Sequence, residues 1–510
     1  MTEKRVLIAA MLSALFLALY SHFLTKKLPV KTSNIDIVSK ATPNAQPRQQ
    51  ETQLIEKEDV VVISSGEIEV EVGKLSGSIR KVALKNFKDE LKLNPVSFGG
   101  ETLPVLAISS EDLVWNLADQ SETKVSFDVT DKSKNIYKVS YAVDWQNPII
   151  DLAIVQKSGN SKEEQVTIYS NWFSSTKIKD RYNNMEGTAL YQNSNGKQLH
   201  KRFLWNRKRL LDVPRGTSLL SLSERYFCQS IEFKSGSIIS QSILPSEEWV
   251  LSSKTDINLP KTGNVSMKIY FGPRDYFYLK KAGMELAFPI GIIEKIGLVL
   301  LWFLNLIANS TRNYGIGIVI FSIFITFMTA PFTLMNFKSM KKLRQLKPEV
   351  DKLMAQYKDD QARASKEVFA LYKENKVSPL SGCLPILFQI PIFIALFKAI
   401  SHFVQLRGKS FLWIADLSLP DRFLHIPFSA PIIGNYINVL PIITAVVMYM
   451  QTKMSSAGME ADTQNPSANI ASSPLMAVLF GLMFYNISSG LVLYWMTNSA
   501  MSVLLFKLSK

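Results

Sequence analysis

The chain has 510 residues, a formal net charge of +15 and a hydrophobic content of 47%. Basic chains often bind nucleic acid, but this one has no nucleic-acid-binding motif, and membrane topology explains its basic residues next to apolar runs. Its two cysteines, Cys228 and Cys383, fall in a predicted soluble part and a predicted span, which argues against an intramolecular disulfide. The four histidines show no metal-ligand spacing, so no metal centre is predicted.

The first predicted element is an apolar run at Val6–Leu24, which follows two basic residues. This arrangement is typical of a cleaved secretory signal or of an uncleaved anchor. The run is longer than a usual signal core and Tyr20–Lys27 offers no small-x-small cleavage site, so we favour a transmembrane anchor at residues 1–27. Residues 28–59 are rich in Gln, Thr, Asn and Pro, which predicts a flexible linker.

Residues 60–281 show the pattern of a β domain. Glu67–Val72 and Tyr137–Val143 alternate with a period of two, and turn sequences such as Ser158–Asn160 separate the runs. Alternation with turns at short spacing predicts a mostly antiparallel β-sandwich. The domain has no Gly-x-Ser-x-Gly, His-rich cluster or P-loop, so no catalytic residue is predicted.

Residues 282–312 are strongly apolar but include charged residues. Their length would also suit a spanning helix. A span here, however, would place Lys338–Lys376 outside, against the positive-inside rule. We therefore favour an amphipathic helix that lies in the outer interface with Glu294 and Lys295 towards water.

Residues 313–510 are predicted to form a membrane core. Asn313–Phe337 and Val377–Phe397 contain no charged residue, and a bilayer crossing needs ~20 mostly apolar residues. Between them, Lys338–Lys376 holds eleven Lys/Arg against six Asp/Glu, an excess that marks a cytosolic loop. Its apolar positions on both sides of Lys358–Asp360 predict a hairpin of two amphipathic helices, with an irregularity at Pro348.

The predicted spans of this core lie at about residues 314–335, 380–403, 432–451, 474–485 and 491–506. The polar segment Thr452–Ser473 returns to the cytosol, and Asn486–Gly490 supplies a tight turn between the last two spans. The fold class is therefore a polytopic α-helical membrane protein, an anchor plus five spans, with an outer all-β domain and a cytosolic helical hairpin. Both ends of the chain are predicted in the cytosol.

Polar residues repeat at helical spacing inside two of these spans. They are Ser322, Thr326, Thr329 and Thr333 in one, and Tyr494, Asn498 and Ser502 in the other, with Gln389 in a third span. A single Ser or Thr more often bonds the carbonyl four residues earlier or packs between helices. Because Asn and Gln are costly in hydrocarbon, the alternative is a hydrated groove open to the membrane.

Basic residues gather at the start of the predicted cytosolic hairpin. They are Lys338, Lys341, Lys342, Arg344 and Lys347. This charge fits topology determinants beside anionic lipid. It also fits a docking surface for an acidic partner, and both interpretations remain open.

Several motifs resemble the YidC membrane protein insertase family, in its bacterial form with a large periplasmic domain. The densest is Asn375–Phe393, and Ser489–Trp495 is similar to the last-span motif of the family. Leu412–Leu417 resembles its outer loop and Tyr270–Pro273 the end of its periplasmic domain. The resemblance covers nearly the whole chain in order. It implies a periplasmic β-supersandwich, five spans after the anchor and a coiled-coil-like cytosolic hairpin in the bacterial inner membrane.

The resemblance also implies a function. Members insert nascent hydrophobic segments through a hydrophilic groove, alone or with the Sec translocon, and act as folding chaperones rather than as enzymes. The implied partners are nascent membrane proteins, the Sec translocon, the ribosome, the signal recognition particle receptor and membrane lipids, with no cofactor. The groove residues that carry over are Ser322, Thr326, Thr329, Gln389, Tyr494, Trp495 and Asn498.

Two features depart from the family pattern. The family commonly places an arginine five residues before the proline that matches Pro331, and here that residue is Thr326. No Lys or Arg lies anywhere in Asn313–Phe337. We therefore do not transfer to this chain the electrostatic attraction of acidic flanking residues that such an arginine would provide. Long basic tails that some relatives use for ribosome contact are not found after Phe506, so ribosome docking would rest on the cytosolic loops.

Two other classes of function compete with this prediction. A solute transporter would show inverted repeats and discontinuous helices around a midplane site, and no convincing repeat is found. A membrane-bound enzyme acting on envelope material would need acids, bases or metal ligands, and the predicted spans offer essentially none. We therefore predict an insertase and chaperone.

Overall fold

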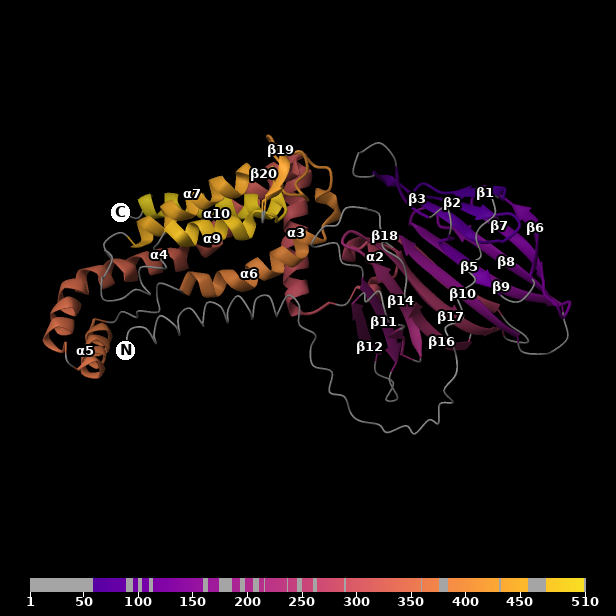
Figure 1. Ribbon diagram of the computed structural model, residues 1–510, viewed down its shortest axis with the longest axis horizontal. Coiled ribbons are helices and arrows are strands. Elements are labelled where there is room, and N and C mark those ends of the chain that lie inside the picture. Colours follow the sequence, from indigo (N-terminus) through magenta and orange to yellow (C-terminus); the bar gives the residue numbers. More distant parts are fainter. Residues whose placement is uncertain are drawn as a thin grey trace. The chain divides into compact units, whose positions relative to one another are not determined.

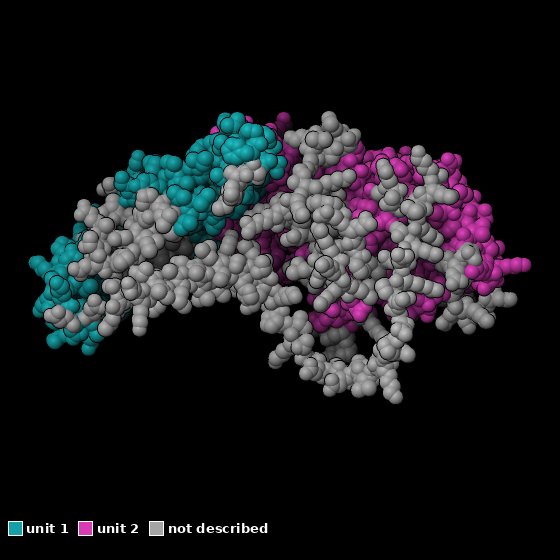
Figure 2. Space-filling model, in the orientation of Figure 1, with its two compact units in different colours: residues 1–51, 316–390, 420–510 teal, residues 52–315, 391–419 magenta. Residues whose placement is uncertain are grey.

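The structure is a computed structural model. It describes residues 58–508 except 89–94, 100–102, 110–112, 159–163, 174–185, 193–197, 205–210, 215, 236, 245–249, 260–263, 289, 359, 376–383, 431–432 and 457–473. The predicted anchor, all but the last two residues of the linker and Cys383 lie outside the described residues. The chain forms two compact units, a helical unit (Ile316–Ile390 and Pro420–Lys510) and a β-domain unit (Thr52–Gly315 and Pro391–Leu419) (Figure 2).

The β-domain unit contains two antiparallel sheets of nine strands each (Figure 1). The first sheet has the order β1 (Val60–Ser64), β2 (Ile68–Gly73), β3 (Ile79–Lys88), β5 (Leu106–Ser109), β10 (Glu164–Phe173), β17 (Val250–Leu259), β16 (Ser237–Leu244) and β13 (Leu211–Asp212), with β4 (Pro95–Phe98) paired to β3. The second has the order β12 (Gln198–Leu204), β11 (Glu186–Gln192), β14 (Thr217–Ser223), β15 (Phe227–Ser235), β18 (Asn264–Pro273), β9 (Ile149–Ser158), β8 (Ile136–Val143), β7 (Lys124–Thr130) and β6 (Val114–Gln120).

The two sheets share one apolar core, so the predicted β-sandwich is confirmed. Along β8 every second residue is buried, as the period-two pattern of the sequence requires. Phe98 of β4 packs against residues of both sheets: its ring lies 4.5 Å from Trp172 of the first and 5.9 Å from Phe227 of the second, centroid to centroid. Such offset and edge-on aromatic contacts add ~0.5–1.5 kcal/mol each beyond burial.

Two short helices and one long helix follow the last strand of the domain. They are α2 (Tyr276–Lys281), η1 (Glu285–Ala287) and α3 (Ile292–Thr311). Asp275 caps α2 by accepting a hydrogen bond from the backbone N–H of Phe277 at 2.8 Å. Burial raises the pKa of the Asp275 carboxyl, although backbone hydrogen bonds from α2 counteract part of that rise.

Helix α3 packs one face against residues 391–401 and leaves another exposed. Gly297 lies on the packed face, where an added Cβ would come within 2.9 Å of the carbonyl oxygen of Ala395. Lys295 is exposed, and the half-buried Glu294 pairs with the more exposed Lys398 at 2.9 Å, a partner that the sequence did not indicate. The exposed face is apolar and carries Ile292, Val299, Trp302 and Leu306.

The helical unit is built from helices and a β-hairpin. Its elements are α4 (Tyr314–Gln356), α5 (Gln361–Glu374), α6 (Leu384–Ser401), β19 (Leu424–Ala430), β20 (Gly434–Ile437), α7 (Val439–Ser456), α9 (Pro474–Phe484) and α10 (Ser489–Leu508), and both α4 and α6 extend into the β-domain unit. Within the helical unit, α7 packs against both α9 and α10. Among the described residues, three stretches are long and apolar enough to cross a membrane: Ile292–Thr311, Tyr314–Pro331 and Ser489–Leu508.

Helix α4 is continuous over 43 residues and contains both Pro331 and Pro348. The expected irregularity at Pro348 therefore does not end the helix, although each proline removes one backbone hydrogen bond. The next helix, α5, begins at Gln361, where Asp360 accepts a hydrogen bond from the N–H of Arg363 at 3.0 Å. The predicted pair of helices on either side of Lys358–Asp360 is thus present.

The fourth predicted span differs from the structure at its start. Residues 434–437 form β20 rather than helix, and α7 begins at Val439. The reason is a distant cap: Asp421 accepts hydrogen bonds from the N–H groups of Val439 and Leu440, both at 2.8 Å. Eighteen residues separate Asp421 from Val439, which is why local sequence did not reveal this boundary.

Glu58 fastens the chain before β1 to the turn between β2 and β3. It accepts hydrogen bonds from the N–H groups of Leu75 at 2.8 Å and Ser76 at 3.0 Å, and from Nε of Arg80 at 3.0 Å. Burial would raise its pKa, but the hydrogen bonds from Ser76 and Arg80 outweigh that effect and hold the pKa of Glu58 below its usual value.

We predict that Glu58→Gln destabilises this edge of the sandwich by ~1–3 kcal/mol, because hydrogen bonds to a charged group are lost. Since the folded-state pKa is lowered, the stabilisation in the wild type is present above the usual glutamate pKa and is lost as pH falls through the folded value. Hydrogen–deuterium exchange of β1 and the Lys74–Ser78 turn measures this. Asp59→Asn is the control, since its pair with Lys74 is exposed and contributes little. Equal protection in both variants would contradict the prediction.

Candidate functional site

The hydroxyl groups on the polar face of α4 bond within their own helix. Ser322 donates to the carbonyl oxygen of Ile318 at 2.6 Å and Thr326 to that of Ser322 at 2.8 Å. Thr329 donates to the carbonyl of Ile325 at 3.0 Å. Ser322 and Thr326 are buried and Thr329 is half-buried. Each hydroxyl has therefore used its single donor, while its oxygen keeps the capacity to accept a hydrogen bond.

A side-chain hydrogen bond joins α6 to α10. Nε2 of Gln389 donates to the hydroxyl oxygen of Tyr494 at 3.1 Å. The Tyr494 side chain is fully buried, and its ring centroid lies 6.0 Å from that of Phe321 in α4. Tyr494 thus links α6 to α10, two of the three helices that carry the predicted polar groups. It contacts the third, α4, through Phe321, which directly precedes Ser322.

The next residue, Trp495, joins α10 to the other two helices. Its indole Nε1 donates to the sulfur of Met448 in α7 at 3.2 Å. Its ring centroid lies 5.2 Å from that of Phe484 in α9. Two consecutive side chains of α10 therefore contact residues of α4, α6, α7 and α9. Tyr494 and Trp495 are referred to below as the aromatic pair.

Asn498 lies one turn after Tyr494 on the same face of α10. Its side-chain nitrogen is buried and has no hydrogen-bond partner among the residues that the structure describes. The neighbouring hydroxyls are satisfied: Thr497 donates to the carbonyl of Leu493 at 2.8 Å and Ser502 to that of Asn498 at 2.9 Å. A buried donor without a partner costs ~1–3 kcal/mol. Asn498 is thus a destabilising residue at the centre of the predicted site.

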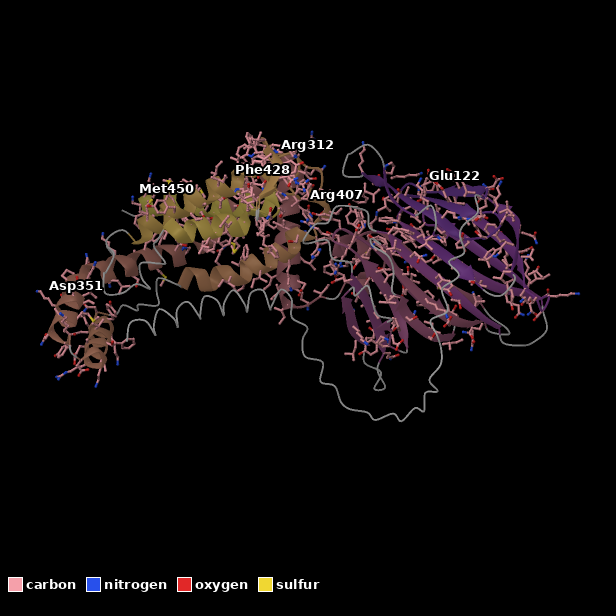
Figure 3. The ribbon with its side chains drawn as sticks, in the orientation of Figure 1. Glu122, Arg312, Asp351, Arg407, Phe428 and Met450 are labelled. Carbon is pink, nitrogen blue, oxygen red and sulfur yellow. The ribbon has the colours of Figure 1, made fainter. Side chains whose placement is uncertain are left out.

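The predicted docking residues lie on the part of α4 that follows Pro331. Lys338, Lys341 and Lys342 are exposed and Lys347 is half-buried, whereas the side chain of Arg344 lies outside the described residues. Asp351 lies further along the same helix (Figure 3). Among the described residues, no group of three or more His, Cys, Asp or Glu side chains could hold a metal ion.

Comparison with known proteins shows which family the chain resembles. A family model described as 60Kd inner membrane protein matches residues 306–507, which include α4 to α9 and all but the last residue of α10. A curated relative from Syntrophus aciditrophicus, named membrane protein insertase YidC, is 26% identical over 98% of both chains. The chain is thus similar to this family over residues 306–507 and, at 26% identity, to one of its named members over nearly the whole length. The resemblance inferred from the motifs is therefore confirmed.

Other relatives of this YidC family match over a shorter length. A membrane protein insertase YidC from Geobacter metallireducens is 31% identical, and the alignment covers 55% of this chain and 50% of that protein. A solved structure titled as an active YidC insertase with its first transmembrane domain resolved covers 88% of this chain and 93% of its own, at 20% identity and a TM-score of 0.38.

Sequence reasoning missed the apolar partners that position the aromatic pair. Phe321, Phe484 and Met448 are ordinary apolar residues of apolar helices, and no periodicity distinguishes them. It also missed Asp421 as the cap of α7 and Asn438 beside it. For Asn438 the sequence did contain a signal, because this residue stands directly before an apolar helical run, the usual position of a cap.

We predict that Gln389 and Tyr494 are energetically coupled. A double-mutant cycle with Gln389→Leu and Tyr494→Phe, measured as the free energy of unfolding in mixed micelles, should give a coupling of ~0.6 kcal/mol, as is usual for side-chain hydrogen bonds in membrane proteins. The matched control pairs Gln389→Leu with Thr497→Val, whose hydroxyl bonds only within α10. Additive effects in the first cycle would show that the hydrogen bond contributes nothing.

Proposed function

We propose that this chain is a membrane protein insertase and folding chaperone of the bacterial inner membrane, and that polar side chains of α4, α6 and α10 form the wall of a groove for a nascent hydrophobic segment. The naming of its relatives as membrane protein insertases supports the class of activity. The contact of Gln389 with Tyr494 supports the position of the groove, because it brings two predicted lining residues together.

The observation that carries the proposal is the unpartnered amide nitrogen of Asn498. A donor of this kind can bond a backbone carbonyl of a polypeptide that displaces the side chains covering it. On the same displacement, the hydroxyl oxygens of Ser322, Thr326 and Thr329 can accept hydrogen bonds from backbone N–H groups, since each keeps its acceptor capacity. The proposed wall therefore offers both kinds of group that an unfolded backbone needs.

These hydrogen bonds to the backbone would lower the energy barrier to insertion, and they would leave its driving force unchanged. Leu, Ile and Phe at a helix centre favour insertion by ~0.3–0.6 kcal/mol each, so an apolar segment supplies its own driving force. Unsatisfied backbone groups cost several kcal/mol each in hydrocarbon, which opposes the transfer of polar flanks. Temporary partners in the groove lower that barrier without a nucleotide or a cofactor. Since Thr326 stands where relatives commonly have arginine, this step does not use a buried cation.

The proposed topology places residues 60–281 in the periplasm, residues 282–312 at the outer interface and residues 313–510 in and below the membrane, with both termini cytosolic. The exposed apolar face of α3 supports the interfacial position, because such a face can rest on lipid. The exposed lysines Lys338, Lys341 and Lys342 support a cytosolic location for the hairpin of α4 and α5.

Partners follow from the same topology. The basic residues of the hairpin form a surface for acidic partners, which we propose to include the ribosome and the signal recognition particle receptor. Cooperation with the Sec translocon and contact with membrane lipids complete the proposal. Neither the groove nor the hairpin requires enzymatic chemistry.

A photocrosslinking residue in place of Trp495 tests the groove. Crosslinks to stalled nascent membrane proteins are expected, since Trp495 adjoins Tyr494 and is only half-buried. Leu504 is the control position: it is exposed and lies nine residues later, about 180° around α10 at 100° per residue. Equal crosslinking at both positions, or labelling by small solutes alone, would favour lipid contact or a transporter over the proposed groove.

We predict that Asn498→Leu separates stability from activity. The change removes a buried donor without a partner, so thermal stability should stay equal or rise, by up to ~1–3 kcal/mol. Insertion of substrates with polar flanks should slow, as followed by protease protection in proteoliposomes. Thr497→Val is the control, because its hydroxyl is already bonded within α10. Unchanged insertion by Asn498→Leu would remove Asn498 from the groove.

A further inference from the structure

Strands β19 (Leu424–Ala430) and β20 (Gly434–Ile437), with Phe423 directly before them, form a β-hairpin that exposes large apolar side chains. Strands β19 and β20 pair antiparallel, with Leu424 opposite Ile437 and His425 opposite Tyr436. Phe428, labelled in Figure 3, is 64% exposed, Phe423 57% and Leu424 53%. We call this segment the outer hairpin. A two-stranded hairpin is marginally stable in water on its own. Exposed apolar side chains of this size mark a surface that binds a partner or a membrane.

The base of the outer hairpin is fixed to the ends of three helices. Asn438 donates through Nδ2 to the carbonyl of Tyr485 at 2.7 Å, and its own N–H donates to the Tyr485 hydroxyl at 3.0 Å. The Tyr485 hydroxyl also donates to the carbonyl of Tyr436 at 3.0 Å. Tyr485 lies in the turn between α9 and α10, and Asn438 immediately precedes α7. The hairpin therefore starts at the level where α7 begins, α9 ends and α10 begins.

This position sets the depth of the hairpin, given the topology proposed above. Helices that cross a bilayer turn at its interface, so the level shared by Asn438 and Tyr485 is the outer membrane interface. Open sheet edges do not occur in the hydrocarbon region, which limits the hairpin to the interfacial layer. Aromatic residues are enriched in that layer.

The two faces of the hairpin near its base differ in polarity. His425 and Tyr436 share one face because they are directly paired, and their ring centroids lie 5.1 Å apart. The guanidinium of Arg422 lies 5.5 Å from the centroid of the Tyr436 ring. Leu424 and Ile437 occupy the opposite face. Arg422 is the sole Asp, Glu, Lys or Arg in residues 422–437, so the hairpin offers no charge pattern for a polypeptide partner.

We propose that the outer hairpin is a lipid anchor, which buries Phe423, Leu424 and Phe428 in the outer interface of the bilayer and so holds the start of α7 at a fixed depth. The occupant of the apolar surface is phospholipid, because the hairpin continues directly from helix ends at the interface. The inference rests on the membrane position of α7, α9 and α10, but not on the groove or on insertion itself.

A fluorophore that reports polarity tests the anchor when it is attached at Phe428→Cys in the full chain carrying Cys383→Ser. Cys228 is 1% exposed, and burial raises its thiol pKa to about 12, so it stays unlabelled under native conditions. The protein is placed in vesicles of phosphatidylethanolamine and phosphatidylglycerol. We expect emission shifted to shorter wavelength, and a greater loss of intensity with nitroxide lipids labelled near the headgroup than with those labelled at the acyl-chain end.

Two further positions make the outcome decisive. Val446→Cys on α7 is exposed and reports the membrane position of that helix, and Asn435→Cys reports a polar exposed site on the same hairpin. Quenching by lipid at residues 428 and 446 but weakly at 435 supports the anchor. Quenching at 446 with aqueous iodide access at 428 overturns the anchor and leaves the topology intact. Shielding of 428 from both lipid and iodide overturns it in favour of a protein partner, and loss of lipid quenching at 446 overturns the proposed topology.

Discussion

The contacts of the aromatic pair hold the helical unit together at its centre. Tyr494 and Trp495 are consecutive, so they point to different sides of α10, and together they contact four other helices. In a bilayer there is no hydrophobic force between helices, and association depends on packing and on specific polar contacts. A bundle linked through two aromatic residues can hold polar side chains near its centre without losing its arrangement.

This arrangement of polar groups costs free energy at Asn498, whereas the neighbouring hydroxyls are satisfied. The hydroxyls of α4 and α10 satisfy themselves through carbonyls of their own helices, so they add polarity without requiring a partner. Asn498 differs, since its amide nitrogen is buried without a partner in the described part of the chain. Functional sites commonly concentrate such locally unfavourable features, whereas the surrounding structure supplies the stability. Here the packing of α7 against α9 and α10 supplies that stability.

The sequence correctly predicted those strands and helices that depend on residues close together in the chain. Period-two alternation located β8, and three- and four-residue spacing located the helices on both sides of Lys358–Asp360. The misses involve residues that are distant in sequence. Asp421 caps α7 from eighteen residues away, and Glu294 pairs with Lys398, which is 104 residues later. For the site, spacing identified Gln389 and Tyr494 separately, but nothing in the sequence could show that they bond each other or that Asn498 lacks a partner.

Helix α4 runs without a break from the hydroxyl side chains in its first half to the exposed lysines in its second half. At 1.5 Å per residue its 43 residues extend about 65 Å, roughly twice the ~30 Å hydrocarbon thickness of a bilayer. Ser322 and Thr326 lie in its first half, and the exposed lysines lie beyond Pro331 in its second. Pro331, where the backbone hydrogen bonding is interrupted, lies between the two groups and is the point at which such a rod would flex.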